Sequence, residues 1–223
     1  MKYCIFTIVL CTFLCAIRAE KPIRVRTLPE FLAALQPGAT ILISPGGLDF
    51  SESKNSMPTS PYASHSPMAS LYIHDLRDLK ILGEGPARVP LSSANSSVGV
   101  VSFANCPRLS LTNLLITHDP SQIRPGAPSS DGSYGTGLTL AQIENLSIRN
   151  VEIGSGSVGL LMLGILGARV DQLDIHNAWQ NALLIDAYPG PKPIPSHDLI
   201  FANLKLHDNP SSGSPVFIRD SNR

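Results

Sequence analysis

The sequence has little charge, few aromatic residues and no excess of either sign of charge. Charged residues make up 15% of its 223 residues, with 17 basic and 17 acidic side chains. Proteins that bind nucleic acid or lie on a membrane surface rely on a positive field, so this balance argues against both classes. Aromatic residues reach only 6%, but hydrophobic residues reach 43%, which excludes a disordered chain.

Cysteine is also scarce in most of the chain. Three of the four cysteines, Cys4, Cys11 and Cys15, lie within the first 15 residues, and the fourth is Cys106. Without the first segment the chain keeps one thiol and forms no internal disulfide, which excludes a disulfide-stabilised miniprotein. Because Cys106 precedes Pro107 and has no neighbouring His or Lys, a buried structural thiol is favoured over a nucleophile.

Residues 1–19 have the pattern of a secretory signal peptide. Lys2 gives a positive start, an apolar run extends from Cys4 to Ile17, and the small residue Ala19 suits a cleavage site. The run is shorter than the ~20 residues of a bilayer-spanning helix, which favours a cleaved leader over a permanent anchor. We therefore expect a secreted or extracytoplasmic protein, periplasmic in a Gram-negative bacterium, without stable membrane insertion after cleavage.

Residues 20–50 are expected to form an N-terminal cap, with one helix and a first strand. Thr27 and Glu30 have the spacing of a capping box, and apolar residues then follow one helical face as far as Leu35. Alternating apolar residues predict a strand over 40–44. Residues 51–70 contain seven Ser and three Pro with little periodicity, so a long surface loop is predicted there.

From residue 71 onward the chain repeats one pattern, an apolar-x-apolar triplet followed by a small polar residue. The triplets end at Ile81, Leu111, Ile148, Val170 and Phe201. In the last four copies a second apolar-x-apolar triplet follows the polar residue. In the first four copies a run of alternating apolar residues also precedes the first triplet. The earlier runs end at Ile73, Phe103, Leu140 and Met162. The three-strand units are constant, whereas the connections between them vary in length, and tight hairpin signals are almost absent. This pattern predicts a parallel solenoid rather than an antiparallel sandwich.

The polar residue of each unit marks a bend between the second and third strands. From the second copy onward this position holds Asn113, Asn150, Gln172 and Asn203. Asn tolerates the left-handed backbone conformation, and its amide can bond to neighbouring backbone or to the equivalent side chain of the next unit. We therefore expect an amide ladder with a structural role.

The pattern resembles the right-handed parallel β-helix of the pectin-lyase-like superfamily. The stretches 71–85 and 101–116 are similar to secreted β-helix repeat proteins, and 28–46 is similar to the capping helix and first strand found there. The resemblance implies an all-β fold, a right-handed parallel β-helix solenoid with a short N-terminal capping α-helix and coils over 71–223. It does not imply one activity, because lyases, hydrolases, epimerases and adhesins share this fold.

The motifs of the characterised enzymes in that superfamily are missing. The sequence lacks the Gly-His-Gly and Arg-Ile-Lys motifs of polygalacturonases, the Arg-x-Pro-x-x-Arg of pectate lyases and the Asp-Pro-His of mannuronan epimerases. In the superfamily, substrate usually lies along the outward face of the first strand of each coil. The central outward residues there are Ser102, Ala104, Thr139, Ala141, Leu161 and Leu163. These side chains offer no base or cation, so no known active site is carried over.

A denser polar group is expected on the outward face of the third strand. Adjacent coils lie about 4.8 Å apart, so Asp174 should meet Lys205, and His176 should meet His207. The candidate catalytic residues are therefore Asp174, His176, His207 and Asp208. Histidines beside carboxylates can transfer protons or bind a divalent metal, whereas the alternative is a solvated polar face with one ion pair. We assign no metal ligands, and any cofactor stays open.

Residues in nearby loops are candidates for contacts with substrate. The longest loop, 117–137, leaves from the same edge and is expected to form a lid or a plain surface insertion. Trp179 is placed in a short turn over 177–182, where an indole either stacks on a sugar or packs over a coil edge. The candidate substrate-binding residues are His118, Asp119, Asp131, Tyr134, Trp179 and Asp186.

Two functions from different classes are compatible with these features. The first is a secreted enzyme, a lyase, hydrolase or epimerase, that acts on or binds polysaccharide. The second is a noncatalytic β-helix that binds glycans or a surface. The chain ends at Arg223, five residues after Ile218 and without an evident closing element, so we also consider truncated coils and a fragment of a larger enzyme.

Overall fold

The computed structural model describes most of the chain after residue 20. The described residues are 21–51, 60–118, 135–154, 156–209 and 215–219. They contain one helix and are otherwise built from β-strands, so the predicted all-β class is confirmed. The predicted signal peptide, 1–19, lies outside the described residues. No helix in the described part of the chain is long and apolar enough to cross a bilayer.

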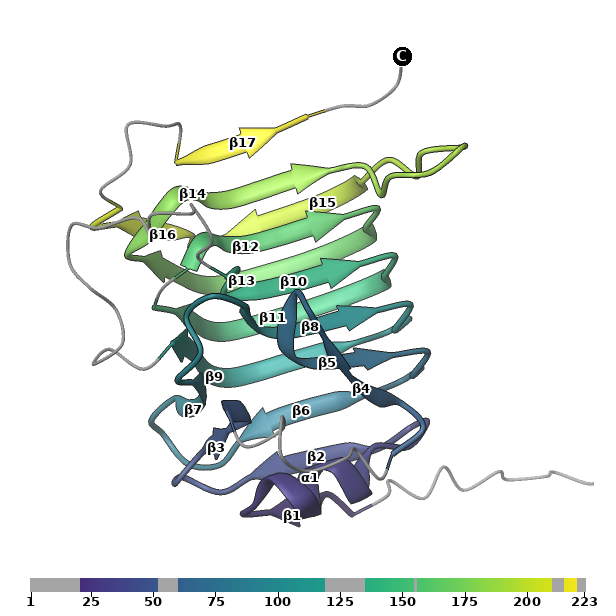
Figure 1. The fold of residues 1–223 in the computed structure, drawn as a ribbon, viewed down its shortest axis with the longest axis vertical. Helices are drawn as coiled ribbons and strands as arrows, with labels where there is room; N and C mark the ends of the chain where they lie inside the picture. The colour runs from purple at the N-terminus through teal and green to yellow at the C-terminus, as the bar shows by residue number, and fades with distance from the viewer. Residues whose placement is uncertain (1–20, 52–59, 119–134, 155, 210–214, 220–223) are drawn as a thin grey trace, which may run out of the picture.

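The strands of the described residues form two sheets (Figure 1). The main path of the first sheet contains β1 (Ile23–Val25), β2 (Thr40–Ile43), β6 (Lys80–Gly83), β9 (Ser110–His118), β11 (Glu144–Ile153), β13 (Leu166–His176) and β15 (His197–Ala202). Three short strands pair off this path, β3 (Leu48–Asp49), β7 (Val89–Ser93) and β16 (Lys205–His207). The second sheet contains β4 (Ala63–Ser66), β5 (Ala69–His74), β8 (Gly99–Ala104), β10 (Leu138–Ala141), β12 (Gly156–Leu163), β14 (Ala178–Asp186) and β17 (Val216–Ile218).

Successive strands alternate between the two sheets. From β8 to β15 each strand of the second sheet is followed by one of the first, and each new strand pairs in parallel with its counterpart from the previous pass. Figure 1 shows these passes stacked along the long axis of the molecule. In the described residues the pair of β4 and β5 is the only antiparallel pair of strands. This arrangement is consistent with a parallel β-helix.

The strand register agrees with the predicted alignment of the repeats. In the first sheet, aligned Cα partners connect Ile81, Leu111, Ile148, Val170 and Phe201. In the second sheet they connect Ile73, Phe103, Leu140, Met162 and Ile185. These residues point inward and pack into one hydrophobic core. Since a shift of one residue would turn every inward side chain outward, the apolar pattern fixes this register.

The bend residues have the expected left-handed backbone. Asn113, Asn150, Gln172 and Asn203 have φ angles between 50° and 59°. In β9, β11 and β13 the strand continues through the bend, so the predicted second and third strands are one bent strand there.

The amide ladder is present in part. Asn113 donates hydrogen bonds to the carbonyl oxygens of Gly83, Gly85 and Ala87 at 2.9–3.1 Å, and accepts one from the Asn150 amide at 2.7 Å. Further along the stack the pattern changes, because the Asn203 amide donates to the Asp171 carboxylate at 2.8 Å. Among the four bend residues, the buried Asn113 therefore has the most hydrogen bonds from its side chain.

The cap helix is α1 (Leu28–Ala34), and it begins at the predicted Thr27 cap, with one of the two hydrogen bonds of a capping box. The backbone N–H of Glu30 donates to Oγ1 of Thr27 at 3.3 Å, and the Glu30 carboxylate accepts from the backbone N–H of Arg26 at 2.7 Å. A strand that the sequence pattern does not predict, β1, precedes the helix and pairs with β2. The first strand is therefore Ile23–Val25, and the predicted strand over 40–44 is the second.

The predicted surface loop over 51–70 is wrong at its C-terminal end. There β4 and the first residues of β5 are strands, and β4 pairs antiparallel with β5, with Ala63 opposite Ile73 and Ser66 opposite Ala69. Residues 52–59 lie outside the described residues. The strand was missed because β4 is a short edge strand whose sequence, Ala-Ser-His-Ser, carries no large apolar residue.

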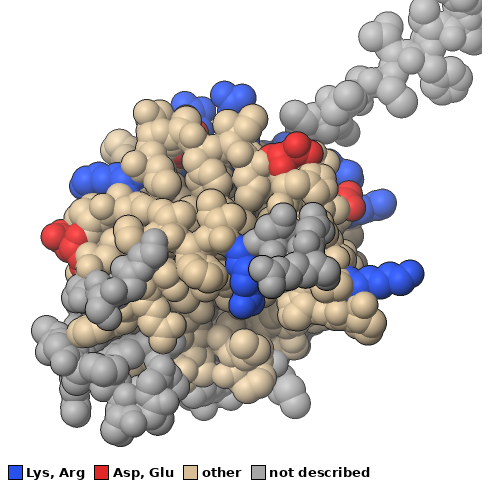
Figure 2. All heavy atoms as spheres, turned by 90° about the horizontal axis from the view of Figure 1, so that it is seen from above, with Lys and Arg blue, Asp and Glu red and all other residues tan. Residues whose placement is uncertain are grey.

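The end of the stack that carries β15 and β17 has a mainly uncharged surface. Its exposed apolar side chains are Ile200, Phe217 and Ile218. Figure 2, which looks at the molecule from this side, shows basic and acidic side chains scattered singly among uncharged ones. No single-sign charged patch is visible on this face, in keeping with the balanced composition.

Cys106 is a buried structural residue, as predicted. It follows the left-handed corner residue Asn105, and Leu76, Ile143 and Ile165 have the same place in other coils, all fully buried. Burial raises the pKa of the Cys106 thiol to about 11. The thiol is therefore protonated and shielded at neutral pH.

We expect the Cys106 thiol to be inert in the folded protein. A water-soluble disulfide reagent should modify it only at the rate of unfolding, because the reactive thiolate is both scarce and inaccessible. Absorbance of the released chromophore, with and without denaturant, measures this difference for residues 20–223. Rapid stoichiometric labelling without denaturant would contradict the burial of this side chain.

Replacing Asn113 with Ala should destabilise the fold by about 2–4 kcal/mol, because three part-buried hydrogen bonds to carbonyl oxygens are lost and Ala is strained at positive φ. Urea unfolding monitored by circular dichroism measures the change. Asn203→Ala is the matched control, since it has the same backbone conformation but an exposed side chain with one hydrogen bond. It should cost about 1 kcal/mol. Equal losses in the two variants would contradict the importance of the Asn113 bonds.

Candidate functional site

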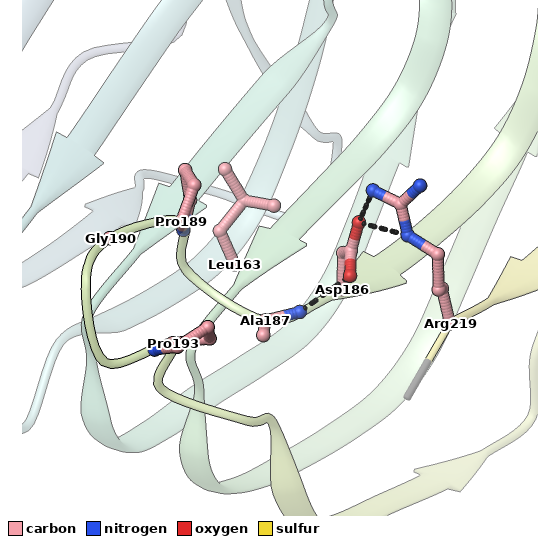
Figure 3. A pocket seen from close by; sticks show the side chains of 7 residues that line it. All are labelled: Leu163, Asp186, Ala187, Pro189, Gly190, Pro193 and Arg219. Atoms are coloured by element: carbon pink, nitrogen blue, oxygen red, sulfur yellow. Dashed lines mark hydrogen bonds and ion pairs between the residues drawn. The ribbon is translucent and has the colours of Figure 1, made fainter. Parts of the chain in front are cut away.

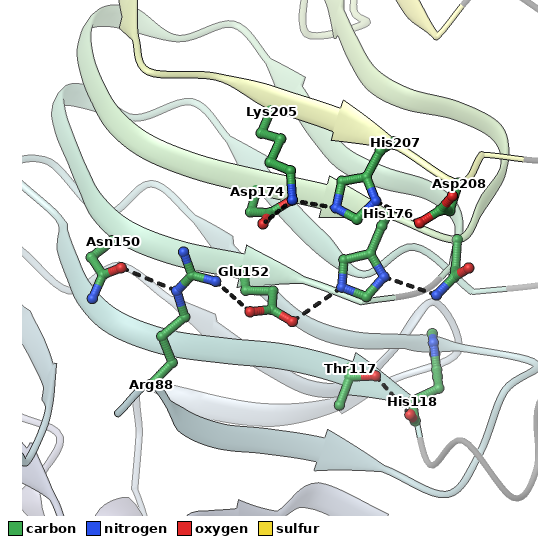
Figure 4. A network of polar contacts seen from close by, with 11 residues as sticks. Arg88, Thr117, His118, Asn150, Glu152, Asp174, His176, Lys205, His207 and Asp208 are labelled. Carbon is green, nitrogen blue, oxygen red and sulfur yellow. Dashed lines mark hydrogen bonds and ion pairs between the residues drawn. The ribbon is translucent and has the colours of Figure 1, made fainter. Parts of the chain in front are cut away.

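The polar group predicted on the third strand lies on the outer side of the first sheet (Figure 4). Three strands supply it, since Glu152 on β11 is aligned with Asp174 on β13, and Asp174 is aligned with Lys205 on β16. Two residues further along, His176 is aligned with His207. We call Arg88, Glu152, Asp174, His176, Lys205, His207 and Asp208 the histidine cluster.

The two imidazoles of the histidine cluster are stacked. Their ring centroids are 5.2 Å apart with an angle of 25° between the planes. Both side chains are half-buried, so each ring keeps one part in contact with solvent. The stack that the sequence predicted is therefore present, and it lies on an accessible surface.

His176 is held between a carboxylate and an amide. Its Nε2 lies 3.1 Å from Oε1 of Glu152, and its Nδ1 lies 2.8 Å from Nδ2 of Asn177. The amide nitrogen can only donate, so Nδ1 accepts and Nε2 donates its proton to the carboxylate. A neutral imidazole satisfies both hydrogen bonds.

His207 is held between two carboxylates. Its Nε2 lies 3.0 Å from Oδ1 of Asp174, and its Nδ1 lies 2.6 Å from Oδ2 of Asp208. Ionised carboxylate oxygens only accept, so the ring satisfies both contacts at once when both nitrogens carry protons. The hydrogen bond from His207 lowers the pKa of Asp208, which is otherwise exposed.

Glu152 connects the histidine cluster to the amide ladder through Arg88. The guanidinium forms an ion pair with the Glu152 carboxylate, and its Nε donates to Oδ1 of Asn150 at 3.1 Å. Burial alone would raise the pKa of Glu152, but hydrogen bonds from His176 and Arg88 outweigh it and lower the pKa. The carboxylate is therefore ionised at neutral pH and can orient His176.

The predicted pair of Asp174 and Lys205 is present, with Nζ 3.5 Å from Oδ2. The Lys205 side chain is 66% exposed, so solvent screens this pair and its contribution to stability is small. Its main effect is local, because it neutralises a carboxylate that also accepts from His207.

Gly154 lies between Thr117 and His176 on the outer face. A Cβ atom at this position would lie 3.1 Å from Oγ1 of Thr117 and 3.4 Å from Cε1 of His176. The contact with Thr117 would be tight for a carbon atom, whereas the contact with His176 would be close to an ordinary van der Waals contact.

The predicted role of His118 in an open loop is wrong. His118 ends strand β9, is 1% exposed, and bonds through Nε2 to the carbonyl oxygen of Val98 at 2.8 Å. Burial lowers its pKa, so the ring is neutral and belongs to the core. Asp119, Asp131 and Tyr134 lie outside the described residues, and their predicted contacts stay untested.

Trp179 and Asp186 differ from their expected surroundings. The turn predicted over 177–182 is mainly strand, because β14 begins at Ala178, and Trp179 is a half-buried residue of that strand. Asp186 is at the outward position expected, but its side chain is buried against Arg219.

Two residues of the histidine cluster, Glu152 and Arg88, are not among the predicted site residues. Glu152 is aligned with Asp174 and points to the same outer face of the sheet. The alternation of side chains along a strand could therefore have identified it. Arg88 lies in the irregular connection between β6 and β7, two passes before β11 in the first sheet, where no periodic signal places a side chain.

The described residues contain no group of three or more His, Cys, Asp or Glu side chains arranged to hold a metal ion. Comparisons with protein-family models, with curated proteins and with solved structures gave no significant match to this chain. The inference about function therefore depends on the geometry of the chain's own residues.

Replacing Arg88 with Gln should raise the pKa of Glu152, because the carboxylate loses a charged partner that favours its ionised form. Carbon-detected NMR titration of the Glu152 carboxyl measures the change. Lys205→Gln is the control, since Lys205 contacts Asp174 instead. An unchanged Glu152 pKa in Arg88→Gln, or an equal shift in both variants, would contradict the ion pair.

The same pair should make stability depend on pH. Because the folded pKa of Glu152 lies below its ordinary value of 4.5, the pair stabilises the fold above that pH and is lost as the pH falls through the folded pKa. Arg88→Gln should therefore lose stability at neutral pH and differ less from the parent chain in acid. Urea unfolding at several pH values measures both, and a constant difference would contradict this linkage.

Proposed function

We propose that the chain is a secreted right-handed parallel β-helix protein of the pectin-lyase-like type that acts on polysaccharide at the histidine cluster. Strands that alternate between two parallel sheets, left-handed Asn corners and an N-terminal cap helix support the β-helix. The right-handed form follows from the strong preference of parallel crossover connections. Extracytoplasmic location is supported by the N-terminal sequence pattern.

Acid-base chemistry is supported by one observation, that each stacked imidazole is hydrogen-bonded to its own carboxylate. A catalytic base needs a group that orients it, and Glu152 and Asp174 supply this for His176 and His207. Nδ1 of His176 accepts from the Asn177 amide, whereas both ring nitrogens of His207 face carboxylate acceptors. One ring can then accept a proton while its neighbour donates one, which suits elimination, hydrolysis or epimerisation.

A polysaccharide is the substrate class that this surface suits best. The histidine cluster lies on the outer side of parallel strands, where successive coils present polar groups at a regular spacing of about 4.8 Å. Carboxylates that accept hydrogen bonds stand beside imidazole and ammonium groups that donate them, which matches the hydroxyls of a sugar chain.

The second candidate function is noncatalytic glycan binding, and a separate observation favours it. All four ring nitrogens of His176 and His207 already have protein partners, so a substrate must displace Asn177 or Asp208 to reach them. A rigid, fully bonded cluster can hold a glycan without transferring protons.

Turnover should separate the two functions. A panel of acidic and neutral polysaccharides can be assayed for unsaturated ends, new reducing ends and inverted sugar configuration, with binding measured in parallel. His176→Ala and His207→Ala should each lower turnover about 100-fold or more. His74→Ala is the control, because His74 also bonds a carboxylate and stacks on a ring, but on the second sheet. Binding without turnover on any polysaccharide would contradict the enzymatic function. Unchanged turnover in both variants would show that the histidine cluster is not the catalytic site.

A further inference from the structure

A pocket lies at the ends of strands of the second sheet (Figure 3). The histidine cluster lies on the first sheet. The volume of the pocket is about 420 Å³, within the roughly 300–1,000 Å³ range of small-molecule sites. Its lining residues are Leu163, Asp186, Ala187, Pro189, Gly190, Pro193 and Arg219. Leu163 and Asp186 are aligned at the ends of β12 and β14, and Arg219 follows β17. Three successive coils therefore form the pocket.

The wall of the pocket is a proline-rich hairpin held at its base. Tyr188 and Ile194 exchange two backbone hydrogen bonds of 2.8 and 3.2 Å. Ser196 donates through Oγ to the carbonyl oxygen of Asp186 at 2.8 Å and accepts from the N–H of Ile165 at 3.0 Å. Pro189 and Pro193 stiffen the segment between, so the pocket is preformed rather than created by a ligand.

Gly164 lets this hairpin approach the sheet. Its φ angle is 63°, and a Cβ atom there would lie 2.8 Å from Cβ of Tyr188 and 3.2 Å from the carbonyl oxygen of Ile194. A side chain would push the hairpin away and open the pocket. Backbone and side-chain contacts thus both specify the shape of the wall.

The polar side of the pocket is an ion pair with unused hydrogen-bonding groups. Asp186 is 7% exposed, accepts from the backbone N–H of Ala187 at 2.8 Å and accepts from Nε and Nη2 of Arg219. The guanidinium lowers the pKa of Asp186, which stays ionised. Arg219 is 65% exposed, so its remaining N–H groups face solvent at the mouth of the pocket.

The charges of this pair select among ligand classes. The carboxylate repels an anion that approaches the guanidinium, and the guanidinium repels a cation that approaches the carboxylate. A neutral hydroxyl group meets neither penalty, because it can donate to the free lone pair of Asp186 and accept from Arg219. The opposite wall, Leu163 and the two prolines, offers apolar surface to the C–H face of a ring.

We propose that this pocket, formed by Asp186, Arg219, Leu163 and the hairpin 188–194, binds one neutral sugar unit through its hydroxyl groups. The sugar lies with its apolar face on Leu163 and the prolines and its hydroxyls on the ion pair. The site is independent of the histidine cluster, so it can anchor a glycan whether or not the protein is an enzyme.

The proposal is tested by NMR titration of the labelled protein with methyl glucoside, methyl galactoside and methyl mannoside at millimolar concentrations. At least one should shift the backbone amide signals of Ala187 and Gly190 in a saturable manner. Glucuronate, inorganic phosphate and choline serve as charged probes and should bind more weakly. If no neutral glycoside shifts these signals, or if a charged probe binds more tightly than every neutral one, the proposal is wrong.

Two pocket variants and two control variants locate the binding. Asp186→Asn should weaken it about tenfold or more, since a charged hydrogen-bond acceptor is lost. Leu163→Trp should also abolish it by filling the pocket, without altering the ion pair. Asp78→Asn is the matched control, because Asp78 forms an equivalent pair with Arg108 in another coil and should leave binding unchanged. Unchanged binding in Leu163→Trp, or equal loss in Asp78→Asn, would overturn the site, and His176→Ala should have no effect on it.

Discussion

The constraint on which the structure depends is the backbone conformation at the corners of each coil. Thirteen described non-glycine residues have positive φ, and they fall into columns that repeat from coil to coil. Asn113, Asn150, Gln172 and Asn203 form one such column. A left-handed residue costs little as Asn or Asp and about 1–2 kcal/mol in most other residues, and ten of the thirteen are Asn or Asp. Once the corners are fixed, the inward and outward side chains of every strand are fixed as well.

The histidine cluster exists because this register holds over three coils. Glu152 and Asp174 are directly opposite each other, a like-charge arrangement that would destabilise a sheet by itself. The cations that offset it come from other coils, Arg88 from an earlier connection and Lys205 from the next strand. The cluster is thus an electrostatic unit assembled across the stack, and no single coil contains it.

The periodic part of the structure could be predicted from the sequence, and the irregular part could not. The strand register, the left-handed bends, the stacking of His176 on His207 and the pair of Asp174 with Lys205 all follow from spacing. The strands β1 and β4 were missed because they are too short or too polar to show a period. His118 was placed in a loop, since no local pattern shows that a strand buries its last residue.

The corner after each stacked histidine shows how such a repeat can change its chemistry without changing its fold. Asn177 and Asp208 have the same left-handed conformation, with φ angles of 58° and 50°, and each bonds to Nδ1 of the preceding ring. Asn supplies a donor there and Asp supplies a charged acceptor, although the two side chains have nearly the same shape. Both residues tolerate the left-handed corner, so one can replace the other while the backbone stays the same. With Asn the Nδ1 atom of the imidazole accepts a hydrogen bond, and with Asp it must donate one. Each coil can therefore acquire its own proton chemistry by single substitutions at a position that the fold already reserves for these two residues.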